Sequence, residues 1–286
     1  MESWETTPIG LEVRLVFARA AVQVIARRAG IRMLHIKGAS IDRSLRATPR
    51  GGSDIDVMVD PAEVERMHAI LLEHGWQVYS DFEAGSPFAH ARTYMHREWG
   101  YLDLHRRFPG IRIPDDRAFE LLWAGHSSHD AAGISCAVPS TDAQTVLLVL
   151  NAAREPVGRR AEARELWACR TPEEHERRAG LVRDLHAEVA FAAALGDLPR
   201  YRGRAEYPLW KAVSEDGGRI AEWWGRIRAA QSLAEALRIA SRAPFVNREV
   251  LGHELGRSPT TKDLLSAYVR RVRVGLREIA RRAVGR

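Results

Sequence analysis

The sequence predicts an α+β protein, with a small mixed β-sheet flanked by helices and then an all-helical C-terminal domain. Three runs in which apolar and polar residues alternate predict strands, at 53–59, 92–98 and 101–106. After these strands, apolar residues recur mainly at helical spacing. We therefore expect a domain boundary that divides the chain into residues 1–138 and 139–286.

The first domain is expected to alternate between helices and strands. Its helices are delimited by residues that start or stop a helix, such as Gly30 after the first of them and Pro61 at the start of another. The expected elements are helices at 11–28, 39–47, 61–75 and 115–124, and strands at 31–36, 53–59, 76–80, 92–98, 101–106 and 134–138.

The second domain is expected to contain helices at 143–154, 181–195, 219–242 and 247–255, and a terminal helix. Thr260 and Asp263 have the spacing of a capping box at the start of that terminal helix. We expect three tryptophans of this domain to anchor a core or an interface: Trp210, Trp223 and Trp224.

Composition is ordinary for a globular protein, with 45% hydrophobic and 28% charged residues among 286. The net charge of +6 is unevenly placed, because residues 262–286 hold eight basic and two acidic residues. This segment could pack as an ordinary terminal helix, bind a polyanion such as RNA, or associate with a membrane surface. Cys136 and Cys169 form no motif, no apolar run spans a membrane, and the polar N-terminus does not resemble a secretion signal. The predicted compartment is the cytoplasm.

Paired carboxylates mark the predicted strand at 53–59. Asp54 and Asp56 lie one pleat apart on the same face, where they repel each other and resist burial unless a cation joins them. Asp103 lies in a second alternating run and is a candidate third carboxylate. A divalent metal is the common remedy for such a cluster, although a bare pair of this kind also occurs on strands that face solvent.

Two glycine-bearing turns accompany the acids. Lys37 and Gly38 end one predicted strand, and the run 50–53 immediately precedes the Asp54–Asp56 pair. Glycine lets a backbone approach a phosphate closely. Only three of the 43 basic residues are lysines, which favours a specific role for Lys37 as a point charge on phosphate, though a solvated lysine at a turn is the alternative.

The three segments KGAS, RGGSDIDVMV and YLDLH, in this order, resemble the uncharacterised nucleotidyltransferase family of the DNA polymerase beta-like superfamily. The resemblance covers about residues 30–110. It implies that Asp54, Asp56 and Asp103 are catalytic and hold two Mg²⁺ ions. It further implies that an NTP is bound by five residues: Lys37, Gly38, Ser40, Arg50 and Ser53. His105 would orient a carboxylate or a substrate, or simply end a strand.

The implied reaction is transfer of a nucleoside monophosphate from an NTP, such as ATP, to a hydroxyl-bearing acceptor, with release of pyrophosphate. The acceptor stays open between tRNA or another RNA, a peptide and a small molecule. One alternative is a non-catalytic RNA- or protein-binding module on the same scaffold, whose expected mark is a missing carboxylate. Another is a metal-dependent phosphatase or nuclease, which has no need of a triphosphate-binding glycine turn.

Overall fold

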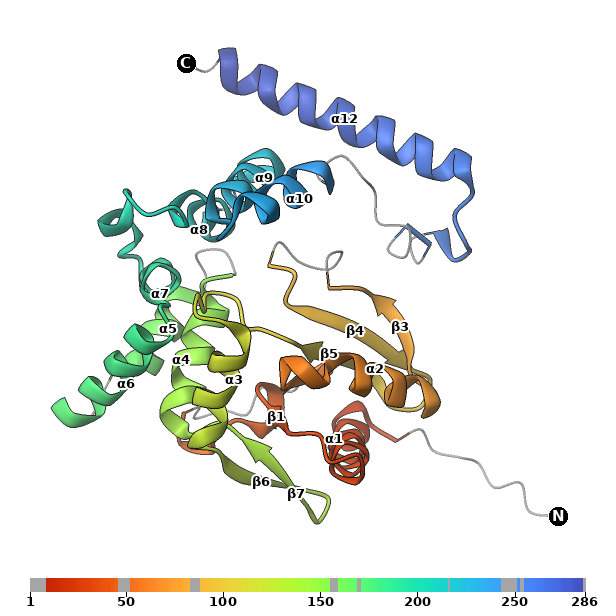
Figure 1. Ribbon diagram of the computed structural model, residues 1–286, viewed down its shortest axis with the longest axis vertical. Coiled ribbons are helices and arrows are strands. Elements are labelled where there is room, and N and C mark those ends of the chain that lie inside the picture. The colour runs from red at the N-terminus through yellow and green to blue at the C-terminus, as the bar shows by residue number, and fades with distance from the viewer. Residues whose placement is uncertain are drawn as a thin grey trace. The chain divides into compact units, whose positions relative to one another are not determined.

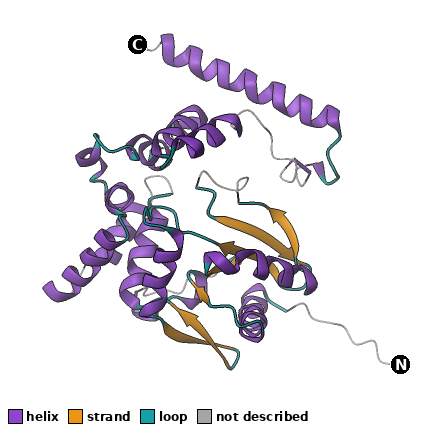
Figure 2. Cartoon of the chain, viewed as in Figure 1, coloured by secondary structure: helices purple, strands orange, loops and turns teal. Residues whose placement is uncertain are grey.

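The computed structural model describes residues 9–45, 52–82, 88–154, 159–168, 171–215, 217–242, 251–252 and 255–284. The chain divides into two compact units. The first comprises residues 1–78, 91–107 and 114–144, and the second comprises residues 79–90, 108–113 and 145–286. Strands gather in the first unit and helices make up most of the second (Figure 2). The predicted α+β class is confirmed.

The first unit contains a five-stranded sheet, a hairpin and short helices, labelled in Figure 1. In chain order its elements are α1 (Leu11–Arg28), β1 (Met33–His35), η1 (Gly38–Ser40), η2 (Arg43–Leu45), β2 (Asp54–Val59), η3 (Pro61–Glu63), α2 (Val64–Glu73), β3 (Gln77–Ser80), β4 (Ala91–His96), β5 (Gly100–His105), α3 (Asp115–Ala124), β6 (Ser127–Ala131) and β7 (Ile134–Val138). The helix α4 (Thr141–Ala152) continues into the second unit.

The large sheet has the order β1-β2-β5-β4-β3. The central pair, β2 and β5, is parallel, whereas β1–β2 and β4–β5 are antiparallel. The predicted strands at 92–98 and 101–106 therefore form the expected hairpin, but each begins one residue earlier and ends one or two residues earlier than predicted. The parallel pair joins two strands that are distant in sequence, and its register sets which side chains of β2 and β5 lie opposite each other.

The core of the first unit lies on both faces of β2. Ile55, Val57 and Met58 are fully buried, and Leu102 and Leu104 of the neighbouring strand are buried beside them. A strand that is buried on both faces usually has a nearly continuous apolar sequence. Polar residues within this strand are therefore costly and need compensation from their neighbours.

The predicted helix at 39–47 is wrong for the residues that the structure describes. The chain instead forms the two short turns η1 and η2, separated at Ile41 and Asp42. Asp42 explains the break: its Oδ1 accepts from Ser44 N at 2.8 Å, and its own N–H donates to Gln144 Oε1 at 2.7 Å. An Asp that bonds the backbone two residues on favours a turn over a continuous helix.

The hairpin formed by β6 and β7 packs against α1 (Figure 1). Strand β7 was predicted, but β6, with the sequence SSHDA, was not, because it carries no apolar alternation. Its turn uses Ala132 and Gly133, both at positive φ, which is the geometry of a two-residue hairpin connection. Turn geometry and pairing with β7 therefore fix this strand.

The second unit is helical among the residues that the structure describes. Its helices are α5 (Arg160–Trp167), α6 (Pro172–Asp184), α7 (Glu188–Leu195), η5 (Leu198–Tyr201), α8 (Tyr207–Ser214), α9 (Gly218–Ala229), α10 (Leu233–Arg242) and α12 (Thr261–Val284). The helices at 172–184 and 207–214 were not predicted as such. Most of the predicted helix at 247–255 lies outside the described residues.

The predicted helix at 219–242 is two helices. Gln231 N donates to Glu235 Oε2 at 2.8 Å, and Glu235 N donates to Ser232 Oγ at 3.1 Å. Ser232 thus caps the first turn of α10, and the Glu235 carboxylate binds the backbone just before it, so α10 starts afresh after the end of α9. Of the tryptophans expected to be anchors, Trp210 is buried, whereas Trp224 is 56% exposed and does not serve as a core anchor.

Helices α8 and α9 approach each other unusually closely. A Cβ atom on Gly225 of α9 would lie 2.5 Å from Leu209 Cα and 2.6 Å from Leu209 N of α8. Only a residue without a side chain fits there, since contacts below 3.0 Å with backbone atoms do not occur in real structures. Gly225 therefore sets the distance between the two helix axes.

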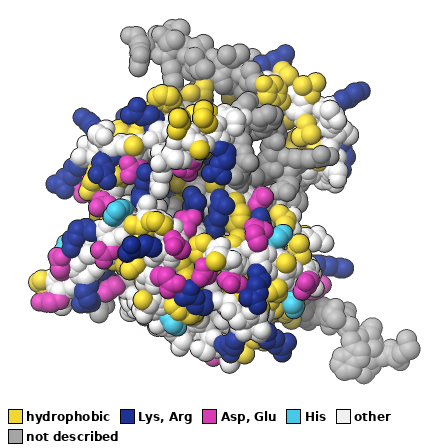
Figure 3. Space-filling model, viewed as in Figure 1, with side chains coloured by type: hydrophobic (Ala, Val, Ile, Leu, Met, Phe, Trp, Pro, Cys, Tyr) yellow, Lys and Arg dark blue, Asp and Glu magenta, His cyan; other side chains and the backbone are white. Residues whose placement is uncertain are grey.

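The terminal helix starts with the predicted cap. Thr260 N donates to Asp263 Oδ2 at 2.8 Å, and Asp263 N donates to Thr260 Oγ1 at 3.3 Å. No helix within the described ranges combines the length and the apolar character needed to cross a membrane. On the face shown in Figure 3, basic and acidic side chains are interspersed.

Cys136 of β7 is fully buried, and burial raises the pKa of its thiol to about 11. We expect this thiol to be inert in the folded protein. In a Cys169→Ser variant, a thiol reagent at pH 8 should label native Cys136 at least about 100-fold more slowly than in urea, because a pKa near 11 leaves so little thiolate. Equal labelling rates in the two conditions would contradict the buried placement.

Candidate active site

Two of the predicted carboxylates meet through the register of the parallel strands. Asp56 of β2 lies directly opposite Asp103 of β5, and Asp54 lies opposite Tyr101. Side-chain ligand atoms of Asp56, Asp103 and His105 all lie within 4.8 Å of one another. The period-2 pattern puts Asp103 and His105 on one face of β5, so the two acids and the histidine form one cluster at the sheet.

Asp56 is the most enclosed of the acids, with 7% of its surface exposed. Lys37 Nζ donates to Asp56 Oδ1 at 2.6 Å, and His105 Nε2 donates to the same oxygen at 2.9 Å. Burial opposes ionisation of Asp56, but Lys37 and His105 outweigh it, so the pKa of this carboxyl falls below its usual value. The Asp56 carboxylate is therefore ionised and held in a fixed orientation.

Asp103 and Asp54 have neighbours of a different kind. Thr93 of β4, opposite Asp103 in the antiparallel pair, donates from Oγ1 to Asp103 Oδ1 at 2.6 Å. Asp54 accepts from Ser53 Oγ at 3.3 Å. Burial and repulsion from Asp56 and Asp103 raise the pKa of Asp54 to about 6. Carboxylates that are partly buried and repel one another in this way form a cluster that would be stabilised by a cation.

The two glycine-bearing segments lie against each other. A Cβ atom on Gly52 would lie 3.9 Å from Gly38 Cα, and Gly38 itself has a φ of +68°. A Cβ atom on Gly38 would lie 2.9 Å from Nη2 of Arg19, which belongs to α1. Glycine is needed at position 38 for two reasons. Its positive φ disfavours other residues, and the absence of a side chain leaves space for the Arg19 guanidinium.

Ser40 ends the η1 turn beside these glycines. Its side chain is 2% exposed, and its Oγ has no hydrogen-bond partner. A buried hydroxyl without a partner is costly, so it points to a group that binds there.

The remaining predicted residues fall in different places. Ser53 is exposed at the start of β2, and Lys37 contacts Asp56. Arg50 lies outside the described residues. Sequence reasoning missed Thr93, which carries no distinguishing pattern, and Arg19, which did leave a signal. Arg19 is a charged residue on the buried stripe of α1 between Leu15 and Val22.

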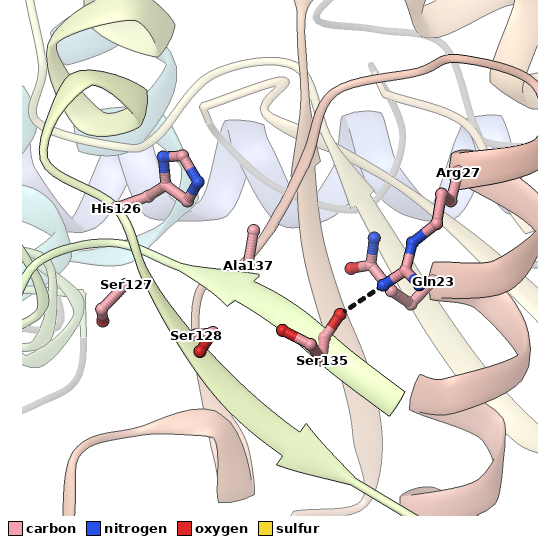
Figure 4. Close-up of a pocket in the computed structure, with 7 residues that line it drawn as sticks. All are labelled: Gln23, Arg27, His126, Ser127, Ser128, Ser135 and Ala137. Carbon is pink, nitrogen blue, oxygen red and sulfur yellow. Dashed lines mark hydrogen bonds between the residues drawn. The ribbon is translucent and has the colours of Figure 1, made fainter. Parts of the chain in front are cut away.

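A separate pocket of about 410 Å³ lies between α1 and the β6–β7 hairpin (Figure 4). The described residues that line it are Gln23, Arg27, His126, Ser127, Ser128, Ser135 and Ala137. Arg27 Nη2 donates to the Ser135 carbonyl oxygen at 2.7 Å across it. None of these lining residues is a carboxylate, so the pocket is distinct from the acid cluster.

Three solved structures resemble the chain weakly. One is a lincomycin-bound lincosamide antibiotic adenylyltransferase, LnuA, with 19% identity and a TM-score of 0.36 over 51% of this chain and 92% of that chain. The second is the antibiotic-resistance factor ANT(2'')-Ia, with 15% identity and a TM-score of 0.34 over 66% of this chain and 93% of that chain. The third is an antigenic nucleotidyltransferase-like protein from Paracoccidioides brasiliensis, with 14% identity and a TM-score of 0.36 over 71% of this chain and 94% of that chain. No curated protein matches the chain in sequence. These low identities and TM-scores leave the assignment to the family comparison.

The family comparison assigns the chain because the match covers more than half of its residues. The model of the family described as "Uncharacterised nucleotidyltransferase" matches residues 15–168, which is more than half of the 286-residue chain. The match includes α1 from residue 15 onward, both glycine-bearing segments and the acids of β2 and β5. The chain therefore belongs to the uncharacterised nucleotidyltransferase family.

Proposed function

We propose that this protein transfers a nucleoside monophosphate from an NTP to a hydroxyl-bearing acceptor, with release of pyrophosphate, and that the reaction depends on two Mg²⁺ ions. The observation that carries the proposal is the cluster of Asp56, Asp103 and His105, with ligand atoms within 4.8 Å of one another, in a chain of this family. Asp54, on the same face of β2 as Asp56, supplies the third carboxylate.

The donor set fits a hard divalent cation. Carboxylate oxygens are the ligands that Mg²⁺ prefers. Burial and then repulsion from Asp56 and Asp103 raise the pKa of Asp54, and a cation would relieve that repulsion. Asp54, Asp56 and Asp103 would hold the ions, while His105 orients Asp56 through its hydrogen bond. Bound divalent ions neutralise the charge that develops on phosphate oxygens during an in-line displacement.

The chain's own residues would then position the reacting groups. The backbone at Gly38 and the hydroxyls of Ser40 and Ser53 would contact the triphosphate. The acceptor hydroxyl oxygen attacks the α-phosphorus, the bond to the bridging oxygen breaks, and pyrophosphate leaves with that electron pair. The carboxylate of Asp103, held by Thr93, takes the hydroxyl proton.

The acceptor is expected to be an RNA such as tRNA, a peptide or a small molecule. The exposed basic side chains of α12 include Lys262, Arg270 and Arg273, and a basic helix is one feature that favours a nucleic acid. The first test should therefore offer a mixture of possible acceptors and not a single compound.

Purified protein incubated with each α-labelled NTP, Mg²⁺ and either total RNA or lysate should transfer label to a macromolecule or a small product. The Asp54→Ala/Asp56→Ala variant should transfer none, and chelation of Mg²⁺ should stop the wild-type reaction. The size and nuclease or protease sensitivity of the labelled product identify the acceptor class. If label moves equally well in the double variant, or if the wild type neither transfers label nor binds any NTP by calorimetry, the proposed function is wrong.

A further inference from the structure

Arg19 is a charged residue in an apolar environment. It belongs to α1, where Leu15, Ala18 and Val22 form the buried stripe, and only 3% of its surface is exposed. Burial of a guanidinium is costly unless hydrogen bonds and an opposite charge compensate for the lost hydration. The Arg19 guanidinium therefore needs a compensating partner.

Within the described ranges, no residue forms a hydrogen bond or an ion pair with the Arg19 guanidinium. Asp56 and Asp54 attract it through space, but burial has the larger effect, and the pKa of Arg19 is lowered. Arg19 thus differs from Arg32, which is bonded to Asp60 and Glu120. A buried guanidinium that makes no hydrogen bond to the described residues around it suits an anionic ligand.

The position of the guanidinium indicates which anion. Its Nη2 lies 2.9 Å from where a Cβ on Gly38 would be, and 3.8 Å from the corresponding position on Gly52. Both residues lack side chains, so the backbone leaves room beside the guanidinium. The buried Ser40 hydroxyl without a partner belongs to the same turn as Gly38. A guanidinium, a hydroxyl and glycine backbone together suit a phosphate group.

Lys37, which the sequence suggested as a phosphate-binding cation, donates from Nζ to Asp56 Oδ1 at 2.6 Å. We propose that Arg19, from a helix outside the glycine and carboxylate motifs, binds the β- and γ-phosphates of the NTP. These are the phosphates that leave as pyrophosphate, whereas the α-phosphorus lies at the carboxylates. This assignment rests on the proposed function. It makes Arg19 the residue that distinguishes an NTP from nucleotides with fewer phosphates.

The competing explanation is structural. Arg19 would then only offset the negative charge of Asp54 and Asp56, and its removal would lower stability without any preference among nucleotides. The two roles differ in one observable quantity, the dependence of affinity on the number of phosphates. Affinity for NTP, NDP, NMP and inorganic pyrophosphate, measured by calorimetry with Mg²⁺, separates them.

Arg19→Met should weaken NTP and pyrophosphate binding by about 10- to 100-fold, the usual effect of losing charge-assisted hydrogen bonds. Affinity for NMP should change by less than about twofold, since a mononucleotide lacks the phosphates concerned. Arg28→Met removes the same charge from an exposed position of the same helix and should leave all four affinities unchanged. Arg19→Lys keeps the charge but loses the planar fork, so it should lose at least about fivefold in NTP affinity even if Arg19→Met fails to fold.

An NTP affinity of folded Arg19→Met or Arg19→Lys within twofold of the wild type would overturn the assignment of Arg19, as would equal losses for NTP and NMP. If the wild type binds NTP and pyrophosphate through Arg19 but the Asp54→Ala/Asp56→Ala variant transfers label as well as the wild type does, Arg19 stands and the proposed function fails. If the wild type transfers label and the Arg19 variants bind NTP as tightly as the wild type does, the proposed function stands and the assignment of Arg19 fails. Absence of both NTP and pyrophosphate binding in the wild type would overturn both.

Discussion

Asp56→Asn is expected to reduce nucleotidyl transfer by about 10³-fold or more, since several kcal/mol of transition-state stabilisation depend on the metal-binding carboxylates. The same change should lower the free energy of unfolding by about 3 kcal/mol, because it takes the Asp56 carboxylate away from the half-buried Lys37 ammonium. Initial rates of label transfer and urea unfolding measure the two effects separately.

The Lys37→Met/Asp56→Asn double variant is the matched control. It removes the uncompensated ammonium together with the carboxylate, so stability should recover substantially while transfer stays absent. Transfer by Asp56→Asn within tenfold of the wild-type rate would show that Asp56 is not part of the reacting centre. Recovery of transfer in the double variant would show that loss of folding, not of chemistry, explains the single change.

Gly225→Ala is expected to destabilise the second unit by about 3 kcal/mol. Alanine within a helix ordinarily stabilises it by about 1 kcal/mol relative to glycine, so helix propensity alone predicts the opposite sign. The added Cβ would meet backbone atoms of Leu209 at 2.5 and 2.6 Å, and backbone cannot move aside as a flexible side chain can. Helices α8 and α9 must therefore separate, which loses the packing of buried residues between them.

Urea unfolding followed by circular dichroism tests this expectation. Gly203→Ala is the control, because Gly203 is exposed and nothing lies within 4 Å of a Cβ placed there. The control should change the free energy of unfolding by less than about 0.5 kcal/mol. A Gly225→Ala protein that is as stable as the wild type would show that α8 and α9 are not in the close contact described.

The parts of the site that follow from local pattern were predictable from the sequence. Alternation put Asp54 and Asp56 in phase on one strand, and Asp103 and His105 in phase on another. Helix α1 was bounded by its periodicity and by Gly30. Each of these expectations depends on residues within one element, so no knowledge of distant partners was needed.

Features that depend on distant partners were not predictable. Whether Asp56 lies opposite Asp103 depends on the register of two strands that are far apart in sequence. The hydrogen bond from Lys37 to Asp56 also joins residues of different segments, and the residues around Lys37 gave no sign that Asp56 would be within reach. The helix expected at 39–47 had acceptable propensity, but Asp42 bonds to Ser44 and Gln144 and interrupts it.

The parallel pairing of β2 and β5 has a consequence for how the family can diverge. Asp56 and Asp103 are brought together by strand register and not by the length of chain that joins them. Insertions or deletions in the connection therefore leave the carboxylates in place, whereas a slip of one residue would turn Asp103 to the opposite face of the sheet. Related sequences should vary widely in the spacing between these acids but preserve the phase of each strand.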